Sequence, residues 1–368
     1  MIDRRLVQNF DWYLILFTLT LIIIGVLNIY SATYQTEEGL RTPIYMKQIY
    51  WAAIGLLFLI VVVVFDYHLL VSLAYPLYGV SVALLLGVLL FGRSISGSQR
   101  WITLASFSFQ PSELIKIALI LALAKYFSQN EKPAAYGLKD LYLPLALVLF
   151  PALLIMKQPD LGTALLLLLA AFSIILFLGV EWKLLVISLG GLLGAFPFLW
   201  QFLKDYQRKR ILIFIQPETD PLGAGYHILQ SKIAVGSGAF LGKGFMKGTQ
   251  GQLRFLPEQH TDFAFSVLAE EWGFIGAFFV LTLYLVLLLW SLNTARQAKD
   301  RFGLILALGV TAILFWQGVI NIGMVLVVVP VLGVPLPFIS YGGSSNLASL
   351  IGIGLLLNIH MRRFIIQS

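Results

Sequence analysis

The feature that most constrains this chain is a series of apolar stretches, each long enough to cross a lipid bilayer as a helix. A membrane-spanning helix needs about 20 mostly apolar residues. A window of that length gives ten stretches, at roughly 12–31, 48–66, 73–91, 112–127, 140–156, 162–179, 183–201, 263–291, 303–329 and 342–360. Some stretches are short or can be divided differently, so nine or eleven spans remain possible. The sequence predicts an all-α integral membrane protein with about ten transmembrane helices.

Composition supports this class and excludes several kinds of site. Charged residues make up only 12% of the 368 residues, whereas soluble domains carry about a quarter. The net charge of +7 does not indicate a nucleic acid partner, because membrane proteins concentrate Lys and Arg in cytoplasmic loops. The absence of Cys excludes disulfides, cysteine-ligated zinc and thiol nucleophiles. The four His residues lie far apart, so there is no histidine metal motif.

The distribution of Lys and Arg predicts the orientation. The first span is too long for a signal peptide and lacks a small-residue cleavage site, so we expect a retained anchor. With both termini in the cytoplasm, cytoplasmic segments carry eleven Lys and Arg residues and the short outer loops five. We expect one transmembrane domain over residues 1–368, with a large extracytoplasmic loop at about 202–262. Within that loop, a helix at 227–235 is expected on the membrane surface, with Ser231 on its polar side.

An acidic cluster precedes and enters the eighth span. The segment 257–273 contains, in order, Glu258, His260, Asp262, Glu270 and Glu271. Ionisable groups at membrane depth are candidates for functional sites, and at least one of the last two carboxylates must be paired or line water. An Asp just before a helix is often an N-cap, which stabilises by about 1 kcal/mol. The neighbouring charges favour a catalytic role for Asp262, with His260 as a candidate for substrate binding.

Two other outer segments carry polar residues beyond what a turn requires. Glu113 and Lys116 lie three residues apart, on one face of the fourth span. They form either a local ion pair or a site in which Lys116 binds phosphate and Glu113 orients it. The segment 157–160 needs Pro and Asp for a turn, but Lys157 and Gln158 are surplus. A plain turn is the alternative, and we predict instead that Lys157 and Asp160 bind substrate.

Two further segments could meet an anion. The basic run at 205–210 lies on the side of the membrane where positive charge is unusual, so Arg208 and Arg210 are candidates for binding a lipid pyrophosphate, with a solvated loop face as the alternative. Free amides near Gly342 and Gly343 could also bind an anion. Small residues in membrane helices more often serve packing, which we favour there.

Seven motifs, spread over nearly the whole chain, resemble those of the SEDS family (shape, elongation, division and sporulation). They are Arg100-Trp101-Ile102, Gln110-Pro111-Ser112-Glu113, Lys157-Gln158-Pro159-Asp160-Leu161-Gly162, Gly223-Ala224-Gly225-Tyr226-His227, Gly242-Lys243-Gly244, Leu256-Pro257-Glu258-Gln259-His260-Thr261-Asp262-Phe263 and Pro337-Phe338-Ile339-Ser340-Tyr341-Gly342-Gly343. The lack of long cytoplasmic tails is more similar to the elongation branch of the family than to the division branch.

The resemblance implies a ten-helix peptidoglycan glycosyltransferase of the bacterial cytoplasmic (inner) membrane. Such enzymes polymerise lipid II and work with a class B penicillin-binding protein, a transpeptidase, among other membrane proteins of the elongation complex. It also implies that Asp262 is essential and that Arg100, Trp101 and Lys116 belong to functional motifs.

The chemistry fits these residues. A lipid pyrophosphate leaves as a stable anion, so one carboxylate, Asp262, suffices as general base. Cations would stabilise the charge on the pyrophosphate, and the candidates are Arg100, Lys116, Arg208 and Arg210. A divalent cation, Mg²⁺ or Mn²⁺, could share this role and is neither required nor excluded.

Two alternatives stay open. A lipid II flippase would have a similar composition, but it needs polar groups through the bilayer midplane. Here the polar groups gather at the outer rim, while the spans 162–179 and 303–329 are almost wholly apolar. A catalytically silent scaffold would leave Asp262, Lys116 and Arg100 without a role.

Overall fold

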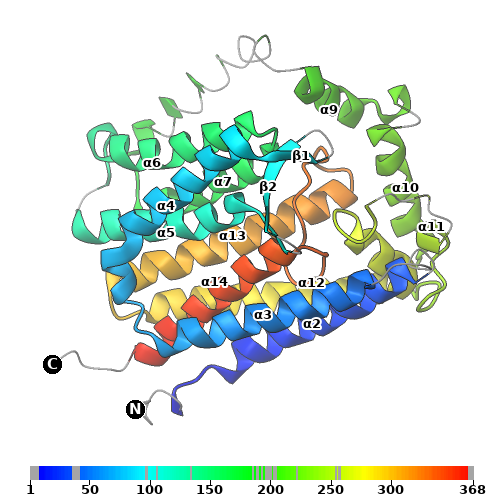
Figure 1. Cartoon of the computed structure of the whole chain (residues 1–368), viewed down its shortest axis with the longest axis horizontal. Coiled ribbons are helices and arrows are strands. Elements are labelled where there is room, and N and C mark those ends of the chain that lie inside the picture. Colours follow the sequence, from blue (N-terminus) through cyan, green and yellow to red (C-terminus); the bar gives the residue numbers. More distant parts are fainter. Residues whose placement is uncertain are drawn as a thin grey trace.

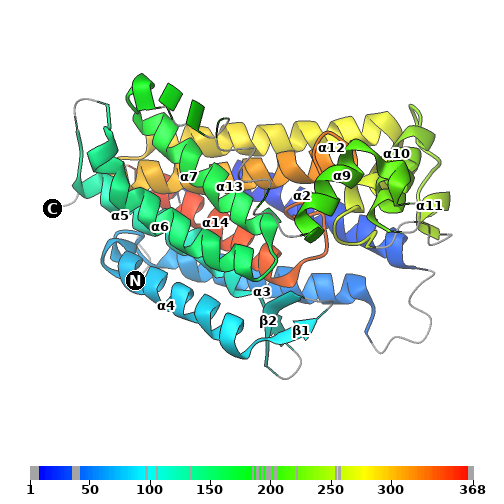
Figure 2. The same ribbon diagram turned by 90° about the horizontal axis from the view of Figure 1, so that it is seen from above.

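The protein is a bundle of long helices with a small sheet and several short helices at one end (Figures 1 and 2). The computed structural model describes residues 8–34, 42–95, 98–104, 107–132, 135–184, 186–187, 190–191, 194, 201, 205–220, 223–252, 255 and 258–363. The long helices are α2 (Trp12–Thr33), α3 (Ile44–Val64), α4 (Leu69–Phe91), α5 (Pro111–Gln129), α6 (Leu138–Lys157), α7 (Leu161–Leu178), α12 (Ala264–Gln297), α13 (Arg301–Val325) and α14 (Gly343–Arg362). The short elements are α9 (Asp205–Ile215), η1 (Pro217–Thr219), α10 (Ala224–Ser237), α11 (Thr249–Gln252) and the strands β1 (Arg93–Ile95), β2 (Ser98–Leu104) and β3 (Phe107–Phe109).

The predicted membrane spans correspond to these long helices. Eight of the described helices are long and apolar enough to cross a membrane: α2, α3, α4, α6, α7, α12, α13 and α14. The predicted fourth span is α5, which starts at Pro111 as expected but is less apolar, since it carries Glu113, Lys116 and Lys125. The predicted seventh span, 183–201, falls mostly outside the described residues. The fold class is therefore confirmed as a nearly all-helical membrane protein.

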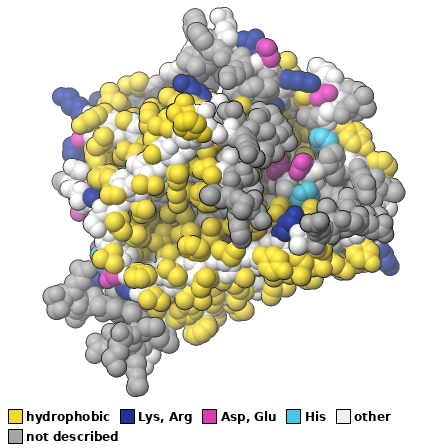
Figure 3. Space-filling view, in the orientation of Figure 1, with side chains coloured by type: hydrophobic (Ala, Val, Ile, Leu, Met, Phe, Trp, Pro, Cys, Tyr) yellow, Lys and Arg dark blue, Asp and Glu magenta, His cyan; other side chains and the backbone are white. Residues whose placement is uncertain are grey.

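Local sequence signals set several helix ends. Asp11 caps α2 by accepting a hydrogen bond from the Leu14 N–H at 3.2 Å, and Asp300 caps α13 by accepting from the Gly303 N–H at 3.0 Å. Pro111 occupies the first position of α5, where a missing N–H costs nothing. The membrane face is apolar, and Figure 3 shows charged side chains concentrated toward the ends of the bundle.

The helices α13 and α14 form the centre of the bundle. Within the most apolar part of each, 72% of the α13 residues and 83% of the α14 residues are buried, against 22% for α3 and 28% for α4. In Figure 1 both helices lie between the α2–α3 pair and the α4–α7 group. Their polar side chains therefore face protein rather than lipid.

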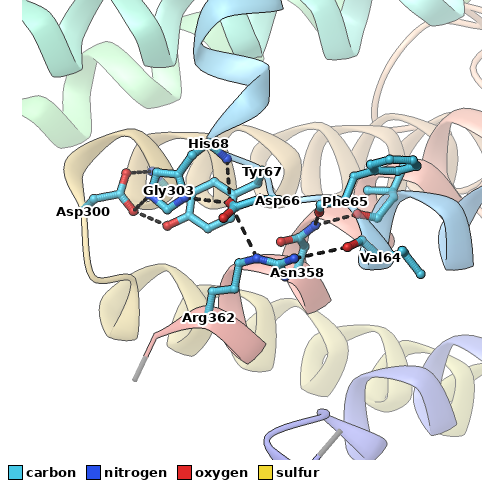
Figure 4. Close-up of polar contacts among 10 residues, drawn as sticks. Val64, Phe65, Asp66, Tyr67, His68, Asp300, Gly303, Asn358 and Arg362 are labelled. Carbon is cyan, nitrogen blue, oxygen red and sulfur yellow. Dashed lines mark hydrogen bonds and ion pairs between the residues drawn. The ribbon is translucent and has the colours of Figure 1, made fainter. Parts of the chain in front are cut away.

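One end of the bundle, here called the terminal end, holds the start of α2 and the end of α14. The Asp11 carboxylate lies 3.6 Å from the His360 ring. Figure 4 shows how the turn between α3 and α4 is tied to its neighbours there: Tyr67 bonds Asp300, and the Arg362 guanidinium lies 3.5 Å from Asp66. The opposite end, here called the site end, holds Asp262. That both termini are cytoplasmic remains a prediction.

The site end departs from the sequence-based expectation in two places. The all-α expectation included no strands, but β1, β2 and β3, between the predicted third and fourth spans, form an antiparallel sheet of order β1-β2-β3, with Arg93 opposite Trp101 and Ile102 opposite Phe109. The expected surface helix is α10, but Ser231 is not on a solvated face. Its buried hydroxyl donates to the Val325 carbonyl at 3.1 Å and lies 2.8 Å from the Ser266 hydroxyl, so the assignment of Ser231 to a polar side was wrong. Ser231 instead forms hydrogen bonds that connect α10 with α12 and α13.

The helix α12 is interrupted at Gly273, where φ is 64° and ψ is −163°. The segment 239–244, here called the clasp, pairs with the backbone groups that the break leaves free. Four hydrogen bonds do this: Lys243 N to Glu270 O at 3.0 Å, Gly244 N to Glu271 O at 2.9 Å, Phe274 N to Ala239 O at 3.0 Å and Ile275 N to Phe240 O at 3.2 Å. The Gly242-Lys243-Gly244 motif is thus explained by contact with a broken membrane helix.

The clasp and its surroundings also bond the buried acids of α12. The fully buried Glu270 carboxylate accepts hydrogen bonds from Lys243 Nζ at 2.6 Å, the Thr249 N–H at 2.9 Å and the Gln250 N–H at 3.2 Å. Glu271 accepts from the Ser31 hydroxyl at 2.5 Å. The expectation that at least one of these carboxylates is paired is met.

The residues 326–342, here called the interior loop, return from α13 to α14 through the bundle. Their backbone is irregular, yet Phe338 and Ile339 are fully buried. Buried polar groups satisfy the loop: Asn346 Oδ1 accepts from Phe338 N at 3.0 Å, Ser340 Oγ accepts from Leu336 N at 3.0 Å, and the Tyr284 hydroxyl donates to Pro337 O at 2.8 Å. Irregular backbone at membrane depth is tolerated only when protein covers it in this way.

Replacing Gly273 by Ala should destabilise the protein. Its backbone region is accessible essentially only to Gly, and a Cβ there would lie 2.2 Å from the Gly242 nitrogen. We expect the free energy of unfolding to fall by at least about 1–3 kcal/mol, seen as a lower melting temperature in detergent. Gly87→Ala in α4 is the control, since a Cβ there meets nothing within 4 Å. Equal melting temperatures for the two variants would contradict the break.

Candidate functional site

Asp262 lies two residues before α12, at the site end of the bundle. The helix has Phe263 at its N-cap and no side-chain capping bond, so Asp262 is not a helix cap. Its side chain is partly exposed. Among the described residues, the carboxylate accepts no hydrogen bond and forms no ion pair, although it is close to several charges. A carboxylate held in this way is free to act on a ligand.

The surroundings of Asp262 bring its pKa close to neutral pH. Burial and, to a smaller extent, the neighbouring Glu258 raise the pKa of Asp262 to about 6, while Arg210 and Arg100 act in the opposite direction. A general base works best with a pKa near the operating pH. The structure thus brings together Asp262, Arg100 and Arg210, three of the residues that the sequence singled out.

Arg100 is held from the sheet against the hinge between α6 and α7. Its Nε donates to Gln158 O at 3.2 Å, its Nη2 bonds Pro159 O, and its Nη1 lies 3.8 Å from Asp160 Oδ1. These contacts fix the guanidinium in place, which suits it to binding an anion without further ordering.

Asp160 lies behind Arg100. It is buried, caps α7 by accepting from the Thr163 N–H at 3.2 Å, and accepts from Gln110 Nε2 at 3.1 Å. The predicted role in substrate binding stays a prediction, and the observed contacts are those of a residue that orients Arg100.

The remaining predicted residues surround this centre at different depths. Arg210 donates from α9 to Val331 O of the interior loop at 3.3 Å. Arg208 donates to Gln201 O at 2.6 Å and is not among the charges that dominate the pKa of Asp262. Trp101 is half-buried in β2 beside Arg100, and Lys157 is exposed at the end of α6.

His260 lies two residues before Asp262 and packs near Tyr341. The two rings are 5.9 Å apart, and the His260 carbonyl accepts from the Tyr341 N–H at 2.7 Å. The anion site considered near Gly342 and Gly343 has a packing explanation instead, since a Cβ at Gly343 would lie 2.2 Å from the Trp51 ring.

Glu113 and Lys116 form an ion pair inside the bundle. Lys116 Nζ lies 2.6 Å from Glu113 Oε2, and the side chains are only 3% and 5% exposed for Lys116 and Glu113. Lys116 also lines a mainly apolar cavity between α5, α13 and α14, together with Gln317, Ile117 and Leu314. The structure thus shows the ion pair and a cavity together, deeper in the bundle than the sequence suggested.

The described residues provide few possible side-chain ligands for a metal ion. Within the described part of the chain, no three His, Cys, Asp or Glu residues are grouped so that they could hold a metal ion. Pyrophosphate oxygens are suitable ligands for a divalent cation.

Sequence reasoning missed two amides of α13. Gln317 and Asn321 lie four residues apart, on one face of a span described as almost wholly apolar. Gln317 lines the cavity with Lys116, and Asn321 Nδ2 donates to the Asp262 carbonyl at 3.0 Å. Two polar residues at helical spacing in an apolar span were the signal that could have identified this face.

With this geometry described, comparison with known proteins gives the class. A family model described as "Cell cycle protein", covering FtsW, RodA and SpoVE, matches residues 11–364. The chain therefore belongs to the SEDS family, the polytopic membrane proteins that include RodA and FtsW. It is 41% identical to the peptidoglycan glycosyltransferase MrdB of Escherichia coli (strain K12), over 96% of this chain and 94% of that protein. It is 34% identical to the peptidoglycan glycosyltransferase RodA of Treponema pallidum (strain Nichols), over 98% and 99%.

Solved structures give the same answer. The structure described as "Structural coordination of polymerization and crosslinking by a peptidoglycan synthase complex" matches with a TM-score of 0.83 and 36% identity, over 96% of this chain and 98% of that chain. RodA of Thermus thermophilus matches with a TM-score of 0.72 and 31% identity, over 96% and 98%. The predicted resemblance to the family, and within it to RodA, is confirmed, as is a multi-pass location in the bacterial inner membrane.

The buried ion pair predicts an asymmetry between single and double variants. Lys116→Met leaves the Glu113 charge buried without its partner, so the free energy of unfolding should fall by about 3 kcal/mol. Adding Glu113→Leu should recover most of this loss, because the double variant buries no charge. Thermal unfolding of both variants in detergent measures the effect. No recovery in the double variant would contradict the pairing, and recovered stability without activity would show that Lys116 also has a functional role.

Proposed function

We propose that this protein is a peptidoglycan glycosyltransferase that polymerises lipid II into β-1,4-linked glycan strands at the outer face of the inner membrane during cell elongation, with Asp262 as general base. Membership of the SEDS family and the names of the relatives support the glycosyltransferase activity. The observation that supports the catalytic assignment is the unpaired Asp262 carboxylate, with its raised pKa, beside Arg100 and Arg210. The flippase alternative is not favoured, since the relatives are named as glycosyltransferases.

The reaction needs one base and a cationic surface. Asp262 takes the proton from the 4-hydroxyl group of the acceptor sugar. At the same time, the oxygen of this hydroxyl group forms a bond to the anomeric carbon of the donor. The bond from that carbon to the pyrophosphate oxygen breaks, and the polyprenyl pyrophosphate leaves as an anion without a general acid. Attack from the face opposite the leaving group converts an α-linked donor into a β-linked product.

Arg100 and Arg210 are positioned to bind the pyrophosphate leaving group. Arg100 is fixed by three oxygen contacts and Arg210 by the interior loop, so neither needs to reorganise as negative charge develops. Lys116 lies deeper in the bundle, where it lines a mainly apolar cavity between α5, α13 and α14, and it remains a further candidate for contact with the pyrophosphate. A divalent cation, Mg²⁺ or Mn²⁺, would be bound by pyrophosphate oxygens and would share in stabilising their charge.

The proposal includes a partner. One structural relative is described as a peptidoglycan synthase complex that coordinates polymerization and crosslinking. We assign a class B penicillin-binding protein, the crosslinking transpeptidase, as the partner of this chain, together with other membrane proteins of the elongation complex.

The substitution Asp262→Asn tests the catalytic assignment directly. It keeps the size of the side chain and removes the base, so polymerisation of lipid II by purified protein should fall by about 100-fold or more, in the range of a lost general base. Gel analysis of labelled glycan measures it, and melting temperature is the folding control. Wild-type polymerisation by Asp262→Asn would overturn the assignment. Transbilayer movement of lipid II by the wild-type protein without any polymer would favour the flippase instead.

The pH dependence of the rate should report the same carboxylate. The base works when deprotonated, so the rate should fall as pH drops through about 6, the raised pKa of Asp262. Glu258→Gln removes one of the charges that raise this pKa, so the acid limb should move to lower pH. The exposed Glu218→Gln is the matched control and should leave the limb in place. If the acid limb of the pH–rate profile does not move in Glu258→Gln, a group other than Asp262 causes it.

A further inference from the structure

The main chain around Asp262 is held by three different elements. Alternate carbonyls are the acceptors: His260 O accepts from the Tyr341 N–H at 2.7 Å, Asp262 O from Asn321 Nδ2 at 3.0 Å and Ala264 O from Asn28 Nδ2 at 2.8 Å. The donors come from the interior loop, from α13 and from α2. The segment that carries the carboxylate is therefore fixed relative to three separate parts of the bundle.

Asn321 is the one donor that acts on Asp262 itself. Its side chain is fully buried in α13, and the same Nδ2 also donates to Val334 O of the interior loop at 2.8 Å. Within the described residues its Oδ1 has no hydrogen-bond partner. A buried amide with an unused acceptor is costly compared with an apolar side chain of similar size. Its two donated bonds are what the fold gains from it.

The second hydrogen bond of Asn321, to Val334 O, connects Asp262 to the part of the interior loop that lies beside its carboxylate. Val334 follows Gly333, where φ is 71° and a Cβ would lie 3.6 Å from Asp262 Oδ2. Arg210 contacts the same loop three residues before Val334, at Val331 O. One amide thus sets the spacing between the carboxylate, the loop that faces it and, through that loop, a candidate phosphate ligand.

We propose that Asn321 is a positioning residue that fixes the Asp262 carboxylate against the interior loop for proton transfer from the acceptor sugar. This inference rests on the proposed function, in which Asp262 is the base. Because Asn321 is buried behind the backbone, it acts on catalysis through Asp262 and not through substrate affinity. A displacement of about 1 Å at a reacting group can cost about 100-fold in rate.

The chain contains a matched control at the terminal end. Asn358 in α14 is also buried, its Nδ2 donates to Val62 O and Phe65 O, and its Oδ1 likewise has no partner in the described part of the chain. Asn358 and Asn321 thus have the same residue type, burial and number of donated bonds, and only Asn321 holds Asp262. The same substitution at both positions separates loss of packing from loss of positioning.

The experiment measures kcat and KM for purified lipid II with Asn321→Leu, Asn358→Leu and wild type, along with melting temperatures in detergent. Both variants should lose similar stability. Only Asn321→Leu should lose kcat, by about 10- to 100-fold, with KM for lipid II unchanged within about twofold. Asn321→Gln, which keeps both donors, should recover part of kcat. If Asn321→Leu does not fold, Asn321→Ser is measured in its place.

Two results would overturn the proposal: wild-type kcat in Asn321→Leu or Asn321→Ser, or an equal loss of kcat in Asn358→Leu. A parallel Asp262→Asn measurement keeps this separate from the proposed function. An inactive Asp262→Asn with a fully active Asn321→Leu would reject the positioning role alone, whereas an active Asp262→Asn would reject the general base itself.

Discussion

Backbone groups inside a bilayer must be paired with protein, and this requirement governs how the site is built. The protein places two irregular segments within its bundle, the break in α12 and the interior loop. Each is satisfied by specific partners: the clasp pairs with the groups around Gly273, and Asn346, Ser340 and Tyr284 pair with the interior loop. The candidate site lies just before α12 and against the interior loop, since Asn321 donates both to Asp262 O and to Val334 O.

The carboxylates near the site differ in how well other residues of the protein bond them. Glu270 is surrounded by donors, Glu271 is bonded by Ser31, and Asp160 caps α7 and lies near Arg100. Asp262 has cations nearby but no hydrogen bond from the described residues. Paired carboxylates stabilise the fold and are poor bases. This contrast identifies the catalytic candidate more clearly than acidity or position in the sequence does.

Much of the fold was predictable because membrane helices carry a strong local signal. Apolar length located the spans, and Pro111 marked the start of α5. The site was partly predictable: motif residues such as Arg100 and Asp262 converge, and of the two alternatives that the spacing of Glu113 and Lys116 left open, the ion pair is present. What failed depended on contacts between distant segments. The role of Asn321 depends on a partner 59 residues away, and the burial of Ser231 depends on α12 and α13. The residue type alone therefore does not show whether a polar side chain is exposed to solvent.

The clasp also has a consequence for how the chain is made. Ser31, Lys243, Thr249 and Gln250, which bond the buried carboxylates of α12, all precede Glu270 and Glu271 in the sequence. During synthesis from the N-terminus, each of these acids is therefore made after the residues that bond it. The carboxylates that are costliest to leave in lipid have their partners available as soon as they enter the membrane, so the order of residues along the chain favours its assembly there.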